Sequence, residues 1–350
     1  MAGFPEVTRP IPGRTAHAPG RVNLIGDHTD YNDGLALPMA IDLGVEVTYR
    51  PGSGSALVIT TDLDPAQAEI PTGPGAREAT VPAWARLARS VVGLMGTVHG
   101  GVAEVRSDLP VGAGLSSSAA FAVALSLALG ADPFPMEMAR RCQEAEREIG
   151  VPVGLMDPLV SMAAAPGHGL LIDFASLETR LIALPDDAEV VVVDSGLTRR
   201  LDASPYATRR SECEAAAAII GRPLGRATTS DLGRISDPLL VRRAAHVVTE
   251  VARVRAFADA LSNADLSTAG GLMVESHRSL CDDFEVSTPA LDRLVATLCA
   301  SPGVYGARVT GAGFGGCVVA LCRTGAQLSL PNRVWRVKAS GGAWVRTTDA

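Results

Sequence analysis

A run of small and aliphatic residues from Ala119 to Leu129 constrains the fold of this chain more than any other feature. It is apolar on nearly every side, so a helix formed by it must be deeply buried. Ser126 interrupts the run, which is also much shorter than the roughly 20 residues that a bilayer requires. We therefore expect a helix in the core of a globular protein.

The stretch that leads into this helix, LPVGAGLSSSAA (Leu109–Ala120), is typical of an anion site. A β-type run is followed by Gly112 and Gly114, then by consecutive serines and the helix. The free N–H groups at a helix N-terminus attract phosphate, and glycine lets the backbone approach it closely. A serine that only caps the helix after a glycine turn would produce the same pattern, so both interpretations stay open.

The rest of the chain mixes strand and helix patterns and predicts an α+β protein. A boundary between two lobes is expected near residues 165–185. Strands are expected at 14–24 with a break at Pro19-Gly20, at 35–43, 45–49, 56–61, 102–107, 169–174, 190–194, 304–310 and 317–321, and as a final pair around Trp335 and Trp344; helices are expected at 84–95, 119–129, 135–149, from about 158, and at 206–220, 237–261 and 265–282.

The basic residues are almost all arginine, and the chain has one lysine, Lys338. A Walker A loop needs a lysine beside its glycine turn, and a protein kinase needs one on its third strand. Neither context exists here, so any phosphate transfer must proceed without a phosphate-binding lysine. The formal net charge of -7 argues against a nucleic-acid partner, which would require a basic face.

The cysteines and the N-terminus indicate a cytoplasmic protein. The six cysteines form no CxxC pair and no Cys/His metal spacing, so they are typical of reduced, buried thiols. The first residues, MAGFPEVTRPIPGRT, lack the apolar run of a signal peptide. No membrane association is therefore expected.

A second chemically dense stretch is GRVNLIGDHTDYNDG (Gly20–Gly34). Arg21, Asp27, His28 and Asp30 lie close together in it, and short polar side chains beside glycine suit the hydroxyl groups of a sugar. A polar surface turn would have a similar composition. A metal site formed by His28 and Asp30 is a weak alternative, because no second histidine or cysteine is near in the sequence.

The third stretch, VTGAGFGGCVV (Val309–Val319), places four glycines between two β-type runs. Such a turn could close over a phosphate or a substrate. It could equally be a hairpin whose small residues allow close backbone packing, which the pattern by itself slightly favours.

Together, these stretches resemble the GHMP small-molecule kinases, and Gly20–Gly34 resembles the signature of the galactokinase family among them. VPVGLMDPLVSM (Val151–Met162), SPYATRRSEC (Ser204–Cys213) and VKASGGAWV (Val337–Val345) also resemble segments of that family, so the likeness spans nearly the whole chain. It implies a two-lobed monomer with a ribosomal-S5-like lobe at 1–170, a ferredoxin-like lobe at 171–350 and an active site in the cleft between them.

The resemblance also implies an ATP- and Mg²⁺-dependent kinase that phosphorylates the anomeric hydroxyl of a free sugar. The roles it implies are Asp157 as base with Arg21 beside the hydroxyl; Asp27, His28, Asp30, Gly154 and Tyr206 for the sugar; Gly112, Gly114, Ser116, Ser117 and Ser118 for the phosphates; Ser118 and Glu146 for Mg²⁺, with Glu144 and Glu148 as competitors; and Trp84 for adenine. Asp157 precedes Pro158, which is also a common N-cap and N1 pair.

This sequence departs from the family pattern at two places. Asp27 replaces the glutamate of the usual GEHTDY, which in the family faces the C6 end of the sugar, and the loss of one methylene withdraws the carboxylate by about 1.5 Å. The segment GLMDPL stands where GIMDQF is usual, and Val153 replaces a cysteine. Galactose is the first expectation, and galactosamine, N-acetylgalactosamine or arabinose are alternatives. A sensor without catalysis is a rival that the presence of both Arg21 and Asp157 disfavours.

Overall fold

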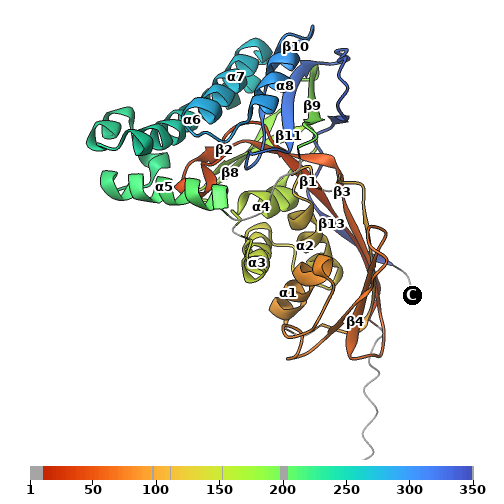
Figure 1. Ribbon diagram of the computed structural model, residues 1–350. Helices are drawn as coiled ribbons and strands as arrows, with labels where there is room; N and C mark the ends of the chain where they lie inside the picture. Colours follow the sequence, from red (N-terminus) through yellow and green to blue (C-terminus); the bar gives the residue numbers. More distant parts are fainter. Residues whose placement is uncertain (1–10, 97, 111, 152, 198–203, 349–350) are drawn as a thin grey trace, which may run out of the picture.

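The computed structural model describes residues 11–96, 98–110, 112–151, 153–197 and 204–348. Within these ranges the chain folds into three β-sheets packed with helices, which confirms the expected α+β class (Figure 1). No helix in the described ranges is both long and apolar enough to cross a membrane.

The largest sheet has the strand order β13-β1-β3-β6-β4-β5 and carries four helices on one face (Figure 1). Neighbouring strands are antiparallel except β4 and β6. The strands are β1 (Gly13–Asn23), β3 (Pro38–Pro51), β4 (Ala56–Thr61), β5 (Ala68–Pro71), β6 (Gly101–Ser107) and β13 (Trp344–Thr348), and the helices are α1 (Arg86–Met95), α2 (Ser117–Ala128), α3 (Pro135–Glu148) and α4 (Met156–Ala163).

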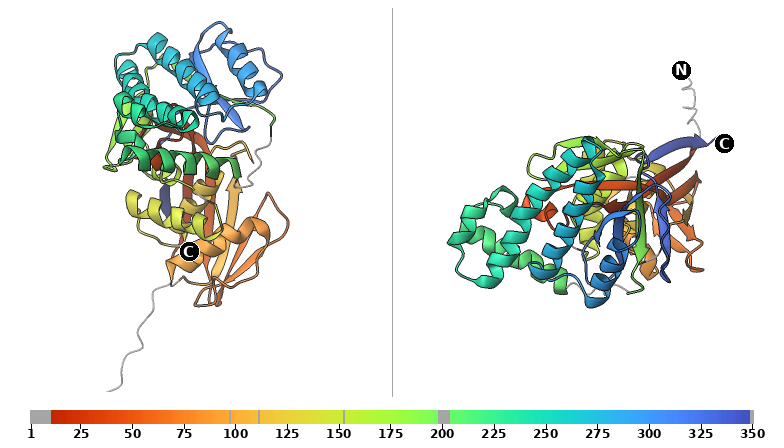
Figure 2. Two further views of the ribbon diagram at one scale, coloured as in Figure 1. Left: turned by 60° about the vertical axis from the view of Figure 1, so that its left-hand side comes forward. Right: turned by 90° about the horizontal axis from the view of Figure 1, so that it is seen from above.

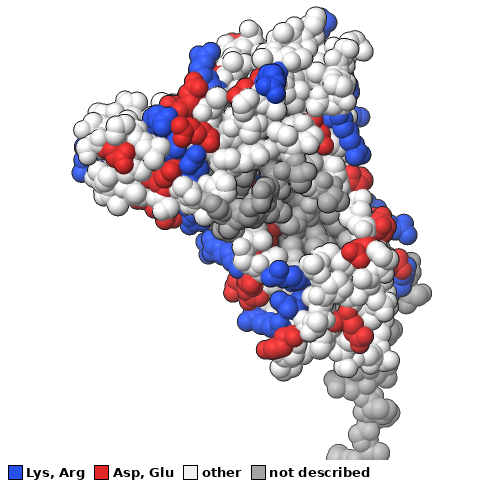
Figure 3. Space-filling model, in the orientation of Figure 1, with Lys and Arg blue, Asp and Glu red and all other residues white. Residues whose placement is uncertain are grey.

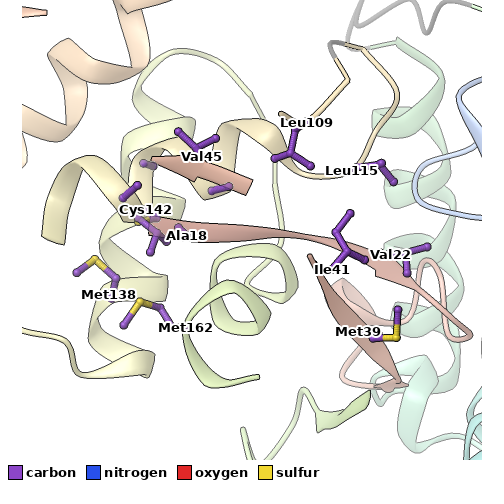
Figure 4. Packing of buried hydrophobic residues seen from close by; sticks show 14 of the residues in the cluster. Ala18, Val22, Met39, Ile41, Val45, Leu109, Leu115, Met138, Cys142 and Met162 are labelled. Atoms are coloured by element: carbon purple, nitrogen blue, oxygen red, sulfur yellow. The ribbon is translucent and has the colours of Figure 1, made fainter. Parts of the chain in front are cut away.

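Helix α2 is the buried helix that the apolar run predicts. From Ala119 to Ala128 its residues are buried apart from Phe121, and it packs against β1 and β3 as well as α1, α3 and α4. Figure 4 shows Leu109 and Leu115, from the loop before α2, in one buried cluster with Val22 of β1. The loop and the strand are therefore held together by apolar contacts.

The remaining elements form two smaller sheets and a helical layer. A four-stranded sheet has the order β10-β11-β9-β12, and a three-stranded sheet has the order β2-β7-β8. Helices α7 and α8 pack on β10, and α6 lies beside α7 in both views of Figure 2. These elements are β2 (Leu35–Ala36), β7 (His168–Asp173), β8 (Thr179–Ala183), β9 (Ala188–Asp194), β10 (Val304–Val309), β11 (Cys317–Arg323), β12 (Val334–Val337), α5 (Ser204–Ile220), α6 (Pro238–Ser262), α7 (Leu266–Asp282) and α8 (Pro289–Cys299).

The expected strand pair around Trp335 and Trp344 is wrong, because the two strands join different sheets. Strand β12 pairs with β9, whereas β13 pairs with β1 and stacks Trp344 on His17. The end of the chain therefore lies in the sheet that the first strand helps to form. The lobe boundary between residues 170 and 171 stays a prediction.

The expected break at Pro19-Gly20 is instead a shift of register within a continuous strand β1. A Cβ atom added to Gly20 would lie 2.6 Å from the Leu115 carbonyl oxygen, so glycine lets the loop before α2 touch the strand. Such irregularities change the direction of the side chains that follow, and the next residue here is Arg21. The two strands expected at 35–43 and 45–49 are likewise not separate. Apart from the short β2, they form one continuous strand, β3.

A close contact between α7 and β10 gives a test of the packing. A Cβ atom added to Gly270 would lie 2.2 Å from the Tyr305 carbonyl oxygen, whereas one added to Gly271 would meet nothing within 4 Å. We expect Gly270→Ala to lower the free energy of unfolding by about 1–3 kcal/mol, measured by urea denaturation. Gly271→Ala should be neutral or stabilising by up to ~1 kcal/mol, because alanine favours a helix interior. Equal effects of the two variants would contradict the close contact.

Candidate active site

An ion pair between Arg21 and Asp157 joins strand β1 to helix α4. Arg21 Nε donates to Asp157 Oδ1 at 2.7 Å, and Nη2 donates to Oδ2 at 2.6 Å. The Arg21 side chain is 8% exposed and that of Asp157 is 25% exposed, so the carboxylate keeps an open edge. Leu155 is the N-cap of α4 and Asp157 lies in the first turn, so the N-cap interpretation of Asp157 is wrong. A carboxylate in this first turn still benefits from the helix dipole.

The loop before α2 is attached to the same arginine. The Arg21 backbone N–H donates to the Leu115 carbonyl at 3.1 Å, and Arg21 Nη1 donates to the Gly114 carbonyl at 2.8 Å. Gly112 has a positive φ of 76° and open space where a side chain would stand. Ser117 and Ser118 are exposed at the start of α2. The predicted phosphate loop and the predicted catalytic pair therefore lie side by side.

Glu146 of α3 has the properties of a buried metal ligand. It is 1% exposed, and its Oε1 atom has no hydrogen-bond partner among the described residues. Burial raises the pKa of Glu146 to about 7, against a hydrogen bond with Ser118 that lowers it. Glu148 instead accepts from Ser90 and pairs with Arg77. Glu144, the other competitor, is exposed.

These oxygen atoms fit Mg²⁺, which prefers carboxylate and hydroxyl ligands and usually keeps several waters or phosphate oxygens. Across the described ranges no group of three or more His, Cys, Asp or Glu side chains is placed to hold a metal. A cation at Glu146 and Ser118 would therefore need nucleotide oxygens and water to complete its coordination. The weaker alternative of a metal at His28 and Asp30 gains no support.

Asp30 lies against the backbone of Gly154, close to the ion pair. A Cβ atom added to Gly154 would lie 1.8 Å from Asp30 Oδ2, so glycine is the one residue that leaves room for this carboxylate. Burial, and then the charge of Asp157, raise the pKa of Asp30 to about 6. Two carboxylates and one arginine thus meet at a single place.

Aromatic rings form a wall beside these carboxylates. The His28 ring lies 4.7 Å from the Phe284 ring and 5.8 Å from the Tyr206 ring, measured between centroids. His28 Nδ1 also lies 3.0 Å from the Tyr31 hydroxyl. Burial, followed by the neighbouring His246 and the charge of Arg308, lowers the pKa of His28 to about 3, so the ring is neutral near pH 7.

Asp27, the unusual residue of the signature stretch, is held from inside the protein. It is 2% exposed; its Oδ1 accepts the Gly311 N–H at 3.0 Å, and its Oδ2 lies 2.8 Å from Arg308 Nη2. Burial raises the pKa of Asp27, although the Arg308 charge opposes this. A sugar-binding role for Asp27 stays a prediction, since its carboxylate already has these two partners.

Arg308 connects Asp27 to a second buried carboxylate, Glu250 of α6. Arg308 is fully buried, and its Nη2 lies 3.9 Å from Glu250 Oε1. Glu250 also accepts the Gly26 N–H at 3.0 Å and the Arg253 Nε–H at 2.7 Å. Burial would raise the pKa of Glu250, but the surrounding cations lower it to about 2. This charged group fixes the signature loop to α6 and β10.

Arg308, Glu250 and Phe284 were missed by sequence reasoning. Arg308 stands alone in the apolar run that forms β10, and Glu250 lies among the apolar residues of α6. A single charge in an otherwise apolar strand is the signal that could have found Arg308, because a buried charge requires a partner.

The third glycine-rich stretch is the turn of the β10–β11 hairpin, as its pattern slightly favoured. Besides the Gly311 contact to Asp27, the Thr310 hydroxyl donates to the Asn23 carbonyl at 2.9 Å. The turn therefore packs on the signature stretch. Trp84 lies in the short 3-10 helix Ala83–Ala85, which directly precedes α1. Its indole N–H donates to the Ala66 carbonyl at 3.0 Å.

Comparison with known proteins shows which family the chain resembles. The family profile "Galactokinase galactose-binding signature" matches residues 6–51, "GHMP kinases N terminal domain" matches 81–164 and "GHMP kinases C terminal" matches 257–333. A galactokinase of Mycobacterium bovis is 41% identical over 343 residues, or 93% of each chain. Human galactokinase is 41% identical over 90% of this chain and 85% of its own length.

The chain belongs to the galactokinase family. The crystal structure of Lactococcus lactis galactokinase complexed with galactose superposes with a TM-score of 0.87 at 25% identity and covers 95% of both chains. A mevalonate kinase structure superposes with a TM-score of 0.66 at 17% identity, which shows the shared GHMP kinase fold. In this galactokinase-family chain, the signature profile contains Arg21 and Asp30, and the N-terminal domain profile contains Asp157.

The buried charges make a test of how the signature loop is held. Arg308→Met leaves Asp27 and Glu250 buried without this cation, so we expect the free energy of unfolding to fall by about 3–5 kcal/mol in urea denaturation. The control Arg50→Met removes an exposed pair with Glu104, in which the side chains are 61% and 40% exposed, and should change it by less than about 1 kcal/mol. A similar small loss in both variants would show that Arg308 is not needed to neutralise the loop.

Proposed function

We propose that this chain transfers the γ-phosphoryl group of ATP to the C1 hydroxyl of D-galactose and releases galactose 1-phosphate and ADP. The observation that carries this proposal is the Arg21–Asp157 pair, which lies directly against the loop before α2. Membership of the galactokinase family supports the same activity. The match to a galactose-binding signature supports galactose rather than another sugar.

In the proposed reaction the oxygen of the C1 hydroxyl bonds to the γ-phosphorus of ATP, and Asp157 accepts the proton of that hydroxyl. The bond between the γ-phosphorus and the oxygen that bridges it to the β-phosphate breaks, which releases ADP. Phosphoryl transfer has a loose transition state, so the position of the groups and their charge supply most of the rate. Arg21 stabilises the negative charge on the sugar oxygen. Its contacts to Asp157 and to the Gly114 carbonyl keep the guanidinium in place.

The phosphates of ATP would bind at the N-terminus of α2. The single lysine, Lys338, is exposed just after strand β12, so backbone N–H groups and serine hydroxyls must replace a phosphate-binding lysine. Gly112, Gly114, Ser117 and Ser118 are the proposed phosphate contacts. Ser118 and Glu146 would hold Mg²⁺, which supplies positive charge to the phosphate oxygens when it is bound. Trp84 is the proposed contact for adenine.

The sugar would lie between Asp30 and the aromatic wall. Asp30 is an ionised acceptor above its pKa of about 6, and Gly154, His28 and Tyr206 border it. Asp27 would act at the same end of the pocket, where its contacts with Arg308 and Gly311 limit its reach. A cytoplasmic monomer remains our expectation. On the face shown in Figure 3 the described Lys, Arg, Asp and Glu side chains are intermixed, which does not favour a nucleic-acid partner.

The first test measures ATP consumption with galactose, galactosamine, N-acetylgalactosamine, arabinose, glucose and 2-deoxygalactose. We expect galactose to give the highest kcat/KM. Asp157→Ala and the isosteric Asp157→Asn should each lower kcat by about 10²–10⁴-fold, because neither side chain can accept the proton. ATP use that no sugar stimulates, together with retained galactose binding, would indicate a sensor. Normal turnover by both variants would remove Asp157 as the base.

A second test concerns the magnesium ligand. Glu146 is protonated below its pKa of about 7 and charged above it, and a metal ion binds the charged form. We therefore expect the Mg²⁺ concentration for half-maximal activity to rise as the pH falls from 8 to 6, by up to about tenfold per unit below pH 7. Glu146→Gln should raise this concentration and remove most of its pH dependence.

Glu144→Gln on the same helix is the matched control, because Glu144 is exposed. It should behave as the wild type in Mg²⁺ titrations at each pH. If Glu144→Gln and not Glu146→Gln weakened the Mg²⁺ response, the assignment of the ligand would be wrong.

A further inference from the structure

Ser116 stands at the N-cap of α2, yet its side chain does not cap the helix. Its backbone has φ 64° and ψ 38°, the left-handed region that non-glycine residues rarely adopt, and no side-chain hydrogen bond to the first turn is present. A capping serine normally has extended backbone angles and stabilises its helix by about 1 kcal/mol. Ser116 therefore has a strained conformation without the usual stabilising contact, and such strain is concentrated at functional positions.

The hydroxyl of Ser116 is directed at Asp157 instead. Ser116 Oγ donates to Asp157 Oδ2 in a part-buried hydrogen bond, and Ser116 itself is largely buried. A hydroxyl has one proton, and an ionised carboxylate can only accept. While Ser116 donates to Asp157, it has no proton left for a phosphate oxygen.

Counting acceptor positions shows what this bond does to the carboxylate. A carboxylate has about four lone-pair positions, two on each oxygen. Arg21 Nε occupies one position on Oδ1, Arg21 Nη2 occupies one on Oδ2, and Ser116 occupies the second position on Oδ2. With the partners that the described residues supply, one position remains, and it lies on Oδ1.

We propose that Ser116 is a positioning residue for Asp157, which it fixes through Oδ2 so that Oδ1 alone is open to the sugar hydroxyl. This inference rests on the proposed function. It also assigns Ser116 a different role from Ser117 and Ser118, which face the nucleotide in our proposal. The three serines of one motif thus divide between the carboxylate and the phosphates.

The same bond couples the nucleotide loop to the catalytic pair. The loop already bonds to Arg21 through the carbonyl oxygens of Gly114 and Leu115, and Ser116 adds a bond to Asp157. A nucleotide that orders this loop therefore also orders both members of the pair. Ser116 acts on turnover and not on the affinity for ATP.

The experiment compares Ser116→Ala and Ser116→Gly with the wild type. Both remove the hydroxyl, and glycine adopts the left-handed backbone without strain, so it serves if the alanine variant folds poorly. We expect kcat to fall about 10- to 100-fold in both, as for a lost hydrogen bond to a charged group. The KM for ATP and the Kd of ADP by calorimetry should change less than threefold. The Tm of Ser116→Gly should change little, because relief of the left-handed backbone strain offsets the lost hydrogen bond to Asp157.

The double variant Ser116→Ala/Asp157→Ala separates the possible roles. If Ser116 acts through Asp157, loss of the Ser116 hydroxyl in the Asp157→Ala background will hardly change the remaining kcat. A further loss of 10-fold or more in that background would overturn the proposal. So would a 10-fold weaker Kd for ADP with unchanged kcat, which would make Ser116 a phosphate ligand.

Failure of the proposed function would look different. It would appear as absence of galactose-stimulated turnover in the wild type, before any variant is compared. In that case the Kd for ADP still tests the role of Ser116. A Kd that is 10-fold or more weaker in Ser116→Gly than in the wild type would assign the hydroxyl to the phosphates. An unchanged Kd would support a hydroxyl that faces Asp157.

Discussion

The bidentate pair of Arg21 and Asp157 is the interaction on which the candidate site depends. It links residues that are 136 positions apart, and the same guanidinium also bonds to the loop before α2. A largely buried arginine must have its donors matched, because an unpaired charge in this environment would be strongly destabilising. Strand β1, helix α4 and the loop before α2 therefore satisfy these polar groups by coming together, and that arrangement assembles the predicted catalytic groups.

A second group of buried charges holds the signature stretch Gly20–Gly34. Arg308 neutralises Asp27 and Glu250, and Glu250 anchors the Gly26 backbone. The Thr29 hydroxyl adds to this by donating to the carbonyl oxygens of Gly26 and of Leu35, which follows the stretch. Much of the polarity of the signature thus closes and fixes the loop, while Asp30 remains beside Gly154 for a ligand. The polar-turn interpretation therefore describes part of this segment, and the sugar-binding role of the rest stays a prediction.

Most of the long, strongly patterned elements could be predicted from the sequence, whereas short strands and the pairing partners of strands could not. Helix α2 follows from its apolar composition, and strand β4 was predicted with its observed bounds. Helix α8 was missed, although Thr288 caps it before Pro289 and its apolar residues have helical spacing. Strand β8 was missed because it is short and mostly exposed. Partners of β12 and β13 were misassigned, because hydrogen-bonding partners of a strand are not encoded in the strand itself.

The sequence by itself determined a buried helix with a glycine and serine N-terminus, a polar stretch typical of sugar binding, and a family resemblance that points to the acid at position 157. The helix and the polar stretch reside in single segments, so local composition and spacing reveal them, whereas the role of Asp157 follows from the resemblance. Only the tertiary structure decided which groups meet. It placed Ser116 on Asp157, Asp27 on Arg308 and Asp30 against Gly154. Each of these contacts joins segments far apart in the chain, and their positions depend on the packing of the whole core.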